Sequence, residues 1–455
     1  MRNKFLLFFG LCALSMSAQD HFSGLRNSNK IGVLSASTNP AELINLGSKY
    51  DINLFSFSIS ASNNKLGFSD LVGSSSDIES KIFAGNEPIN LRVDAEVYGP
   101  GFAMKVNKWA FGVTTKSYVK ANIVDIDSKL GKAIIDGNDS ALVSNTILKS
   151  DYNQRLNATT WGELGFTVAR NLIDTEKHKI SGGASIKLLF PGAYANVGID
   201  KFQGNIDYKL NGAIPPAPTA YLNDVNTKLN IAYSGNIANS SDVASSIIGK
   251  MNGVALDLGV NYQLKDTKNK GYLLNTGLAF KNMGSMTFKD QSNSSTNYTL
   301  NIPTGTTFNP GLDLQSFENA DGLKDVEKIL KDKNYLTTNK TESDIKVKLP
   351  AVFSAYADIK VVSKLFVSLY TQQKLGNDND NDQITTQNVV SVTPRFSLNN
   401  FELFSSWATN EISGTTGGVG FRLYGFYMGS SSIITALASD TKQADFYMGY
   451  RLALR

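Results

Sequence analysis

Cysteine and histidine are almost missing from the sequence. Cys12 is the only cysteine, and it lies in an apolar N-terminal stretch that we expect to be removed. A mature chain without cysteine has no disulfide, no thiol nucleophile and no thiolate metal site. The two histidines are His21 and His178, and the sequence contains no hydrolase, metalloprotease or phosphate-loop motif. We therefore expect no metal site, no cofactor and no enzymatic activity.

One class of enzyme stays open, namely a barrel hydrolase with a Ser–His pair on its lipid-facing wall. That arrangement needs His178 in the middle of the wall beside a serine. The pattern places His178 at a short turn instead.

Charged residues are scarce, and long apolar runs are missing. Only 18% of the residues are charged, against about a quarter in soluble proteins. After the first twenty residues every hydrophobic run is interrupted within a few positions, which excludes a spanning helix. An apolar content of 42% excludes a disordered chain. These properties, with 10% aromatic residues, favour an outer-membrane β-barrel.

Residues 1–18 have the parts of a secretory signal. Arg2 and Lys4 form a basic start, 5–14 an apolar core and 15–18 the exit to the cleavage site. We expect cleavage after Ala18 and a place in the cell outer membrane. Loss of Arg2 and Lys4 lowers the formal net charge from +4 to +2. No basic cluster remains that would indicate a nucleic-acid partner.

An alternation of apolar and polar residues dominates the rest of the chain. In 89–97 the odd positions are aliphatic and the even positions are Asn, Arg, Asp and Glu. A strand places all these charges on one face, whereas a helix would spread them around its axis. In an outer-membrane barrel this alternation means lipid outside and a wet lumen inside.

Fourteen segments follow this pattern, and their connections alternate in length. Connections of 27, 35, 62 and 67 residues follow the first, third, fifth and seventh segments, and only short turns follow the second, fourth, sixth and eighth. We therefore predict an all-β fold, a single 14-stranded antiparallel transmembrane β-barrel with long external loops. The serine run in 427–434 favours neither face, so twelve strands stay possible. The predicted strands are 53–61, 89–106, 110–123, 159–171, 178–190, 253–265, 271–281, 349–361, 365–375, 388–398, 401–409, 416–424, 427–434 and 442–454.

The charged faces of these strands are predicted to line the lumen. Because both signs occur, strong ion selectivity is not expected, and the same groups can instead form ion pairs that lock the wall. Trp109 and Trp407 have outward parity, whereas Trp161 falls on the lumen face, which predicts a bulge at Gly162 or a register error. The lumen candidates are Arg92, Asp94, Glu96, Glu163, Arg170, Asp257, Lys281, Arg422 and Arg451.

Two external loops carry apolar residues at helical spacing, in 322–335 and 241–251. Each predicts a short amphipathic helix that either packs above the barrel or docks a partner. A third loop alternates carboxylates over 378–382, as a calcium loop does, but it lacks the glycine and final carboxylate of that motif. We expect a solvated loop tip there.

Short motifs add to this topology. Asn39, Pro40 and Ala41 precede the first strand, 277–284 ends in Asn-Met-Gly, and 447–454 carries spaced Tyr, Gly and Leu residues. With fourteen strands and the longest loops third and fourth, these features resemble the FadL-like superfamily of outer-membrane barrels, which includes PorV-type barrels and relatives in Bacteroidota. The resemblance of 447–454 to the assembly signal implies contact with the barrel-assembly machinery.

The resemblance implies an N-terminal plug, and it divides the chain into a signal peptide (1–18), a plug segment (19–51) and a barrel (52–455). Fourteen strands enclose a lumen too wide for wall side chains to fill. Asn39, Pro40 and Ala41 are the candidate plug motif, in which Pro40 suits a turn inside the barrel or an ordinary turn before the first strand. Gly99, Pro100 and Gly101 interrupt the second strand and predict a bulge or gap in the wall; the family's opening lies in its third strand.

Two functions follow as expectations. The resemblance implies a channel for small hydrophobic molecules, which would contact outer-membrane lipids and a hydrophobic ligand. The alternative is a non-transporting barrel that serves as a subunit or docking platform of a secretion or surface-protein assembly. The large loops with apolar helices favour the alternative modestly.

Overall fold

The computed structural model describes most of the chain after residue 20. The predicted signal peptide and its cleavage site lie outside the described residues. The described residues are 21–26, 28, 30–72, 78–135, 146–151, 153–210, 218–234, 248–269, 271–289, 293–317, 320 and 322–454.

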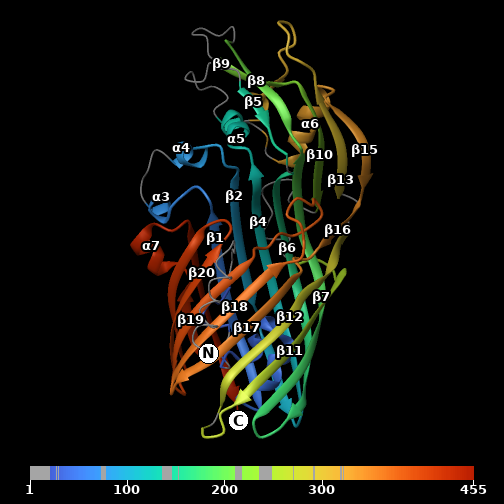
Figure 1. Cartoon of the computed structure of the whole chain (residues 1–455). Helices are drawn as coiled ribbons and strands as arrows, with labels where there is room; N and C mark the ends of the chain where they lie inside the picture. Colours follow the sequence, from blue (N-terminus) through green and yellow to red (C-terminus); the bar gives the residue numbers. More distant parts are fainter. Residues whose placement is uncertain are drawn as a thin grey trace.

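A closed antiparallel barrel of fourteen strands forms the body of the molecule (Figure 1). The last strand pairs with the first, from Tyr50–Leu454 to Ser62–Gln443, and this pairing closes the barrel. The predicted fold is confirmed. The wall consists of β1 (Tyr50–Asn63), β2 (Ile89–Tyr98) continued by β3 (Gly101–Val106), β4 (Trp109–Ile126), β6 (Gln154–Asp174), β7 (His178–Asp200), β11 (Gly253–Lys265), β12 (Tyr272–Lys289), β17 (Val352–Val362), β18 (Leu365–Lys374), β19 (Val389–Ser397), β20 (Phe401–Asn410), β21 (Gly414–Leu423), β22 (Phe426–Ser430) and β23 (Gln443–Leu454).

The thirteenth strand, β22, is the shortest of the wall, with five residues. It pairs with both β21 and β23, so the count of fourteen holds and the alternative of twelve strands is wrong. The serine run does not continue the strand. It leads into α7 (Ile433–Ser439).

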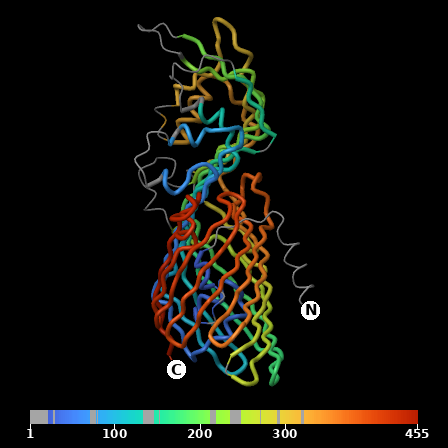
Figure 2. Tube along the Cα trace, turned by 60° about the vertical axis from the view of Figure 1, so that its left-hand side comes forward, coloured from blue at the N-terminus to red at the C-terminus, as the bar shows by residue number. Residues whose placement is uncertain are grey.

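Several strands are far longer than a membrane requires. β4, β6 and β7 have 18, 21 and 23 residues, whereas about 9–11 residues cross a bilayer. Their extensions carry β10 (Val225–Ser234), β13 (Ser294–Ile302) and β15 (Leu336–Glu342) as further paired strands. β16 (Asp344–Lys348) pairs with the end of β12. Together these strands build an external domain above the barrel (Figures 1 and 2).

Short elements complete the external domain. A second sheet contains β5 (Thr146–Lys149), β8 (Gln203–Leu210), β9 (Pro218–Asn223) and β14 (Leu312–Asp313). The helical elements are α3 (Phe68–Val72), α4 (Ile78–Ile82), α5 (Ser128–Ile135), η5 (Leu314–Phe317) and α6 (Leu323–Asp332). The helix predicted in 322–335 is thus confirmed as α6. The one predicted in 241–251 lies largely outside the described residues.

The outer face of the barrel is apolar and exposed. Phe102, Phe111 and Phe166 are 41%, 41% and 46% exposed, and Trp109 and Trp407 also point outward. An exposed apolar band around a closed barrel is typical of a wall that contacts lipid. Trp161 does face the interior, where its ring stacks on Tyr118 at 4.3 Å between centroids. Within the described part of the chain, none of the helices has the length and apolarity to cross a membrane.

Candidate functional site

The structure places the described residues of 21–49 inside the barrel, and we call this segment the plug. It contains η1 (Gly32–Leu34), α2 (Ser35–Thr38) and η2 (Pro40–Asn45). Figure 2 shows the plug as the blue trace within the lower part of the barrel, beside the short turns. Leu43 and Ile44 are fully buried in a cluster with wall alanines. The plug is therefore part of the core of the barrel.

Asn39, Pro40 and Ala41 are buried against the wall. Asn39 is the N-cap of η2: its Oδ1 accepts from Ala41 N at 2.9 Å. Its Nδ2 donates to the carbonyls of Val260 on β11 (2.8 Å) and Leu278 on β12 (3.3 Å). Pro40 occupies the first helical position, where a missing N–H costs nothing.

The wall has glycines opposite this motif. A Cβ on Gly183 of β7 would lie 2.5 Å from Ala41 N and from the Pro40 carbonyl carbon. Gly259 of β11 and Gly277 of β12 face Asn39 in the same way. We call these three glycines the glycine socket, because their missing side chains make the space that the motif fills.

Glu42 continues the contact between plug and wall. Its Oε1 accepts hydrogen bonds from Asn261 and Asn275, both at 2.8 Å, and from the Tyr356 hydroxyl. Its Oε2 accepts from Asn45 at 2.8 Å. The carboxylate is thereby satisfied without a cation among these contacts.

Eight of the nine lumen candidates are buried inside the barrel, and the polar contacts given for them include seven ion pairs. Lys187 pairs with Asp257 at 2.7 Å and approaches Glu163 at 3.9 Å. The remaining pairs and contacts are Lys116–Glu163 (3.5 Å), Lys120–Asp94, Arg92–Asp378 (3.7 Å), Arg422–Glu402 (2.8 Å), Arg451–Asp51 and Lys281 Nζ to the Ser37 carbonyl (3.3 Å). Glu96, also buried, lines the lumen cavity. This pattern favours a wall locked by ion pairs over an open charged pore.

Arg170 is the exception, and its assignment to the lumen is wrong. It shares the outward parity of Phe166 and Val168 and is exposed. Its guanidinium lies over the ring of Trp109, 4.8 Å from the centroid. A cation on an outward aromatic residue at the short-turn end suits the membrane interface.

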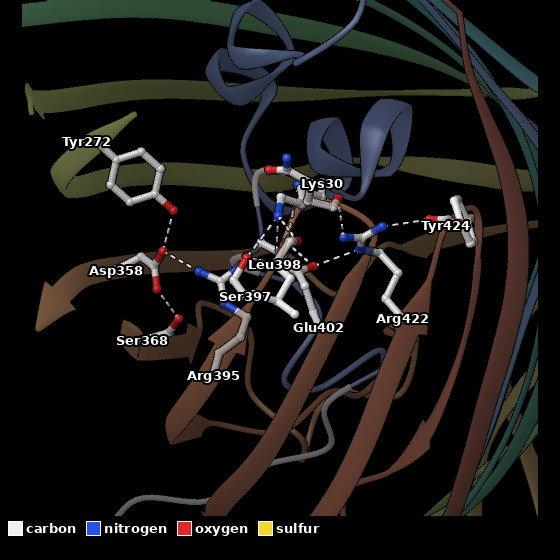
Figure 3. A network of polar contacts seen from close by, with 12 residues as sticks. Lys30, Tyr272, Asp358, Ser368, Arg395, Ser397, Leu398, Glu402, Arg422 and Tyr424 are labelled. Atoms are coloured by element: carbon white, nitrogen blue, oxygen red, sulfur yellow. Dashed lines mark hydrogen bonds and ion pairs between the residues drawn. The ribbon is translucent and has the colours of Figure 1, made fainter. Parts of the chain in front are cut away.

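A second polar network ties the plug to the opposite wall (Figure 3). Arg395 lies between two carboxylates, at 2.5 Å from Asp358 and 3.5 Å from Glu402. Arg422 bonds the other oxygen of Glu402, which also accepts from the plug residue Ser28 at 2.8 Å. Lys30 of the plug donates to the Leu398 carbonyl at 2.5 Å. Apart from Lys30 these residues are buried, so the network holds the plug by charge-assisted bonds.

Between the plug and the external mouth lies a lumen cavity of about 140 Å³. Acidic and basic side chains of both plug and wall line it, together with Tyr98 and Trp161. His21 Nδ1 is 2.8 Å from Ser58 Oγ, and its Nε2 is 3.5 Å from Asp94. Phe22 beside it packs among three tyrosines.

The loop 375–388 folds inward over the mouth and closes this cavity from above. Arg155 of β6 donates to the carbonyls of Asp378 (2.7 Å), Asn381 (3.0 Å) and Gln383 (3.0 Å). Tyr194 donates to the Asn381 carbonyl at 2.9 Å. The expectation of a solvated tip is thus wrong at Asn381, although Asp380 and Asp382 are exposed. We call residues 375–388 the lid.

The wall is continuous past Gly99, Pro100 and Gly101. β1 pairs with β2 up to Tyr98 and with β3 from Gly101 onward without a change of register. The register against β4 shifts by one residue, so the interruption is a bulge. Thr115 Oγ1 donates to the Pro100 carbonyl at 2.8 Å, and Asn53 donates to the Gly99 carbonyl at 2.9 Å.

The external domain contains a half-open chamber of about 840 Å³, which the sequence did not reveal. Its lining side chains are apolar except for Gln154. They come from the long strands β2, β4, β6, β7, β10 and β13, from β9 and β14 of the second sheet, and from α4, α5, η5 and α6. We call it the apolar chamber.

Helix α6 lines one side of the apolar chamber, and its Glu327 attaches the helix to the external strands β10 and β13. Glu327 accepts from Lys331 at 2.7 Å, from Tyr233 at 3.2 Å and from the Tyr298 hydroxyl. Burial acts to raise the pKa of Glu327, but the hydrogen bonds from Lys331 and Tyr298 outweigh it and leave the pKa lowered.

His178 is exposed at the first residue of β7, with Nδ1 2.9 Å from the Tyr262 hydroxyl. A Ser–His pair in the middle of the wall is thus not formed by this histidine. Among the described residues, no group of three His, Cys, Asp or Glu side chains could hold a metal ion.

Comparison with solved structures finds chains of similar length. The TodX deltaS2S3 mutant monoaromatic hydrocarbon channel is 10% identical and aligns over 92% of both chains, with a TM-score of 0.43. The CymD monoaromatic hydrocarbon channel is 12% identical over 93% of this chain and 94% of its own (TM-score 0.42). A FadL homologue of Pseudomonas aeruginosa is 9% identical over 97% and 100% (TM-score 0.40).

None of the curated proteins matches the sequence. One family model does, and it aligns with residues 40–431, from the proline of the plug motif to the residue after the thirteenth strand. Because this match spans most of the sequence, the chain belongs to DUF5723, a family of unknown function.

Proposed function

We propose that this protein is an outer-membrane β-barrel that takes up small hydrophobic molecules and binds them in the apolar chamber. The observation that carries the proposal is the chamber itself. A volume of about 840 Å³ with an almost wholly apolar lining falls in the range of ligand pockets, roughly 300–1,000 Å³. Each square ångström of apolar ligand surface buried there contributes about 25 cal/mol.

A binding titration tests the proposal. The purified full chain is titrated with a neutral fluorescent probe, N-phenyl-1-naphthylamine. We expect saturable binding to the wild type and about tenfold weaker binding to Leu300→Lys, because a lysine in the chamber leaves a buried charge unpaired. Ile147→Lys is the matched control, since Ile147 is 73% exposed outside the chamber. A wild type that binds no probe refutes the proposal.

Passage through the lumen is a separate step, because the plug and the lid both block it in this structure. Flux of a hydrophobic compound into liposomes, measured with the full chain and with a chain that lacks residues 19–49, tests it. Absence of flux in both forms would leave the chamber as a binding site and remove the channel.

A second candidate function, the docking platform, is favoured by apolar side chains exposed on the external domain. Phe308, Ile147 and Leu210 are 100%, 73% and 72% exposed. Lys209 Nζ donates to the Thr306 carbonyl at 2.8 Å, so the end of β8 lies beside the loop that carries Phe308. A stoichiometric partner recovered in mild detergent, and lost with Phe308→Ser, would support this function.

A further inference from the structure

The apolar chamber lies on the outward side of the barrel wall. Ile123 of β4 and Leu156 of β6 face each other across the ladder and line the chamber. Their neighbours Asn122 and Asn157 are hydrogen-bonded at 2.8 Å on the lumen side. Because successive residues of a strand point to opposite faces, the chamber shares its face with the lipid-contacting band and not with the lumen.

That face is continuous and uncharged between the band and the chamber. On β4 the outward residues from Val113 to Ile123 are Val, Thr, Ser, Val, Ala and Ile. On β6 the outward residues from Phe166 to Leu156 are Phe, Leu, Gly, Thr, Ala and Leu, and the apolar side chain of Ile248 covers Gly162, where a Cβ would lie 3.1 Å from it. The charged residues of these stretches, Lys116, Lys120 and Glu163, are all buried on the other face.

The chamber begins where the bilayer ends. From Trp109 at the short-turn end, β4 reaches Val119 after eleven residues, which is about the length that a tilted strand needs to cross a membrane. Ala121, paired with Ala158, and then Ile123, paired with Leu156, follow directly. The small side chains of the two alanines leave space on the outer face between the bilayer and the chamber.

The lumen offers no route between β4 and β6. Their ladder is unbroken from Trp109–Arg170 to Val124–Arg155. The lumen side of the same strands carries the buried ion pairs of Lys116 and Lys120, and an apolar chain that crossed this layer would have to displace them.

We propose that the occupant of the apolar chamber is the acyl chain of an outer-leaflet lipid, which enters sideways from the bilayer over Ala121 and Ala158. This inference rests on the proposed function and names its ligand class and its route. An acyl chain that takes this path meets no charged side chain on β4 or β6 and crosses only Val119, Ala121 and Ile123 on β4 above the bilayer. A route through water or through the lumen exposes it to polar groups.

Photolabelling tests the route. The full chain is reconstituted in phosphatidylcholine vesicles that contain a trace of phosphatidylcholine with a diazirine at the end of one acyl chain. A short-chain alcohol with the same diazirine is added from water to a parallel sample. After irradiation, labelled peptides are mapped by mass spectrometry. We expect both probes to label the chamber strands around Val197 and Leu300.

Variants separate the route from the chamber. Ala121→Glu and Ala158→Glu should each lower chamber labelling by the lipid about tenfold, since a carboxylate on the path is costly in an apolar medium. Labelling by the short-chain alcohol should not change. Thr409→Glu is the matched control, because Thr409 has the outward parity of Trp407 at the external end of β20. Heat-modifiable migration checks that each variant is folded.

The outcomes are distinct. If the lipid labels only the barrel wall while the alcohol labels the chamber, entry from the bilayer is wrong and the proposed function stands. If neither probe labels the chamber, both proposals fall. Equal labelling of the chamber by the lipid in wild type, Ala121→Glu and Ala158→Glu overturns the path over the two alanines.

Discussion

Asn39 of the plug occupies the space that a side chain on Gly259 of the wall would need. The same asparagine donates to the backbone of the two strands at this place. Neither residue can therefore be changed without an effect on the other, and the pair couples the docking of the plug to the backbone of the wall.

Gly259→Ala should displace the plug and leave the barrel closed. Overpacking of this kind costs about 1–3 kcal/mol. The barrel keeps its heat-modifiable migration, and limited proteolysis of the N-terminal segment becomes faster. Gly47→Ala, in the plug but with open space around the new Cβ, is the control. Equal proteolysis of the two variants would contradict the role of the glycine socket.

Arg395→Met should destabilise the barrel strongly. Asp358 would then remain buried without its cation, whereas Glu402 keeps Arg422. Removal of one partner of a buried ion pair costs about 3–5 kcal/mol. The measurement is the denaturant midpoint of unfolding, followed by gel migration. If Asp358→Asn restores part of the loss in the double variant, the cause is the orphaned charge; an Arg395→Met midpoint equal to wild type would show that the network does not stabilise the fold.

Arg155→Ala should free the lid. Three carbonyls of the 375–388 loop lose their common donor, and each hydrogen bond to a charged group contributes about 1.5–3 kcal/mol. A cysteine placed at Thr386, the only thiol of the mature variant if the leader with Cys12 is cleaved, then reacts faster with a water-soluble maleimide. Arg170→Ala is the control, since Arg170 lies on the outer face. Unchanged reactivity in Arg155→Ala would mean that other contacts hold the lid.

Acid should loosen α6 from the external sheet. Because the folded pKa of Glu327 is lowered, its stabilising effect is fully present above its ordinary value of 4.5 and is lost as the pH falls through the folded value. Hydrogen exchange in 323–332, compared at pH 7 and at acid pH, measures this. Glu327→Gln should abolish the pH dependence of that exchange; if it persists, another group is responsible.

The barrel was predictable because lipid and lumen impose a period of two on every strand, and the short turns separate the strands cleanly. The strands of the external domain were not predictable in this way. β10 and β13 carry Asn230 and Asn297, hydrogen-bonded at 2.9 Å in a row that continues inward to Asn196 of β7. In a sequence, asparagines of this kind are typical of loops. Only the hydrogen-bonded row that they form across neighbouring strands shows that the barrel wall continues above the membrane.

Site residues were predictable where charge and alternation coincide, as at Asp94 and Asp257. Arg170 was misplaced because a charge at a strand end was assigned to the lumen, although parity with Phe166 indicates the outer face. Glu42 and Arg155 were missed since neither lies in a motif, and their roles depend on contacts with residues about 220 positions away. The apolar chamber was missed because its walls come from many elements that lie far apart in the sequence.

The glycine socket also has a consequence for the order of assembly. Asn39 contacts strands more than 200 residues further along the chain, and contacts of such long separation form late. The N-terminal segment can dock only after β7, β11 and β12 have paired. β1, which follows it directly, must in turn wait for β23. The plug and the closing seam are therefore both late events, so the nascent barrel stays open at β1 and β23 while the segment that will fill it is still outside.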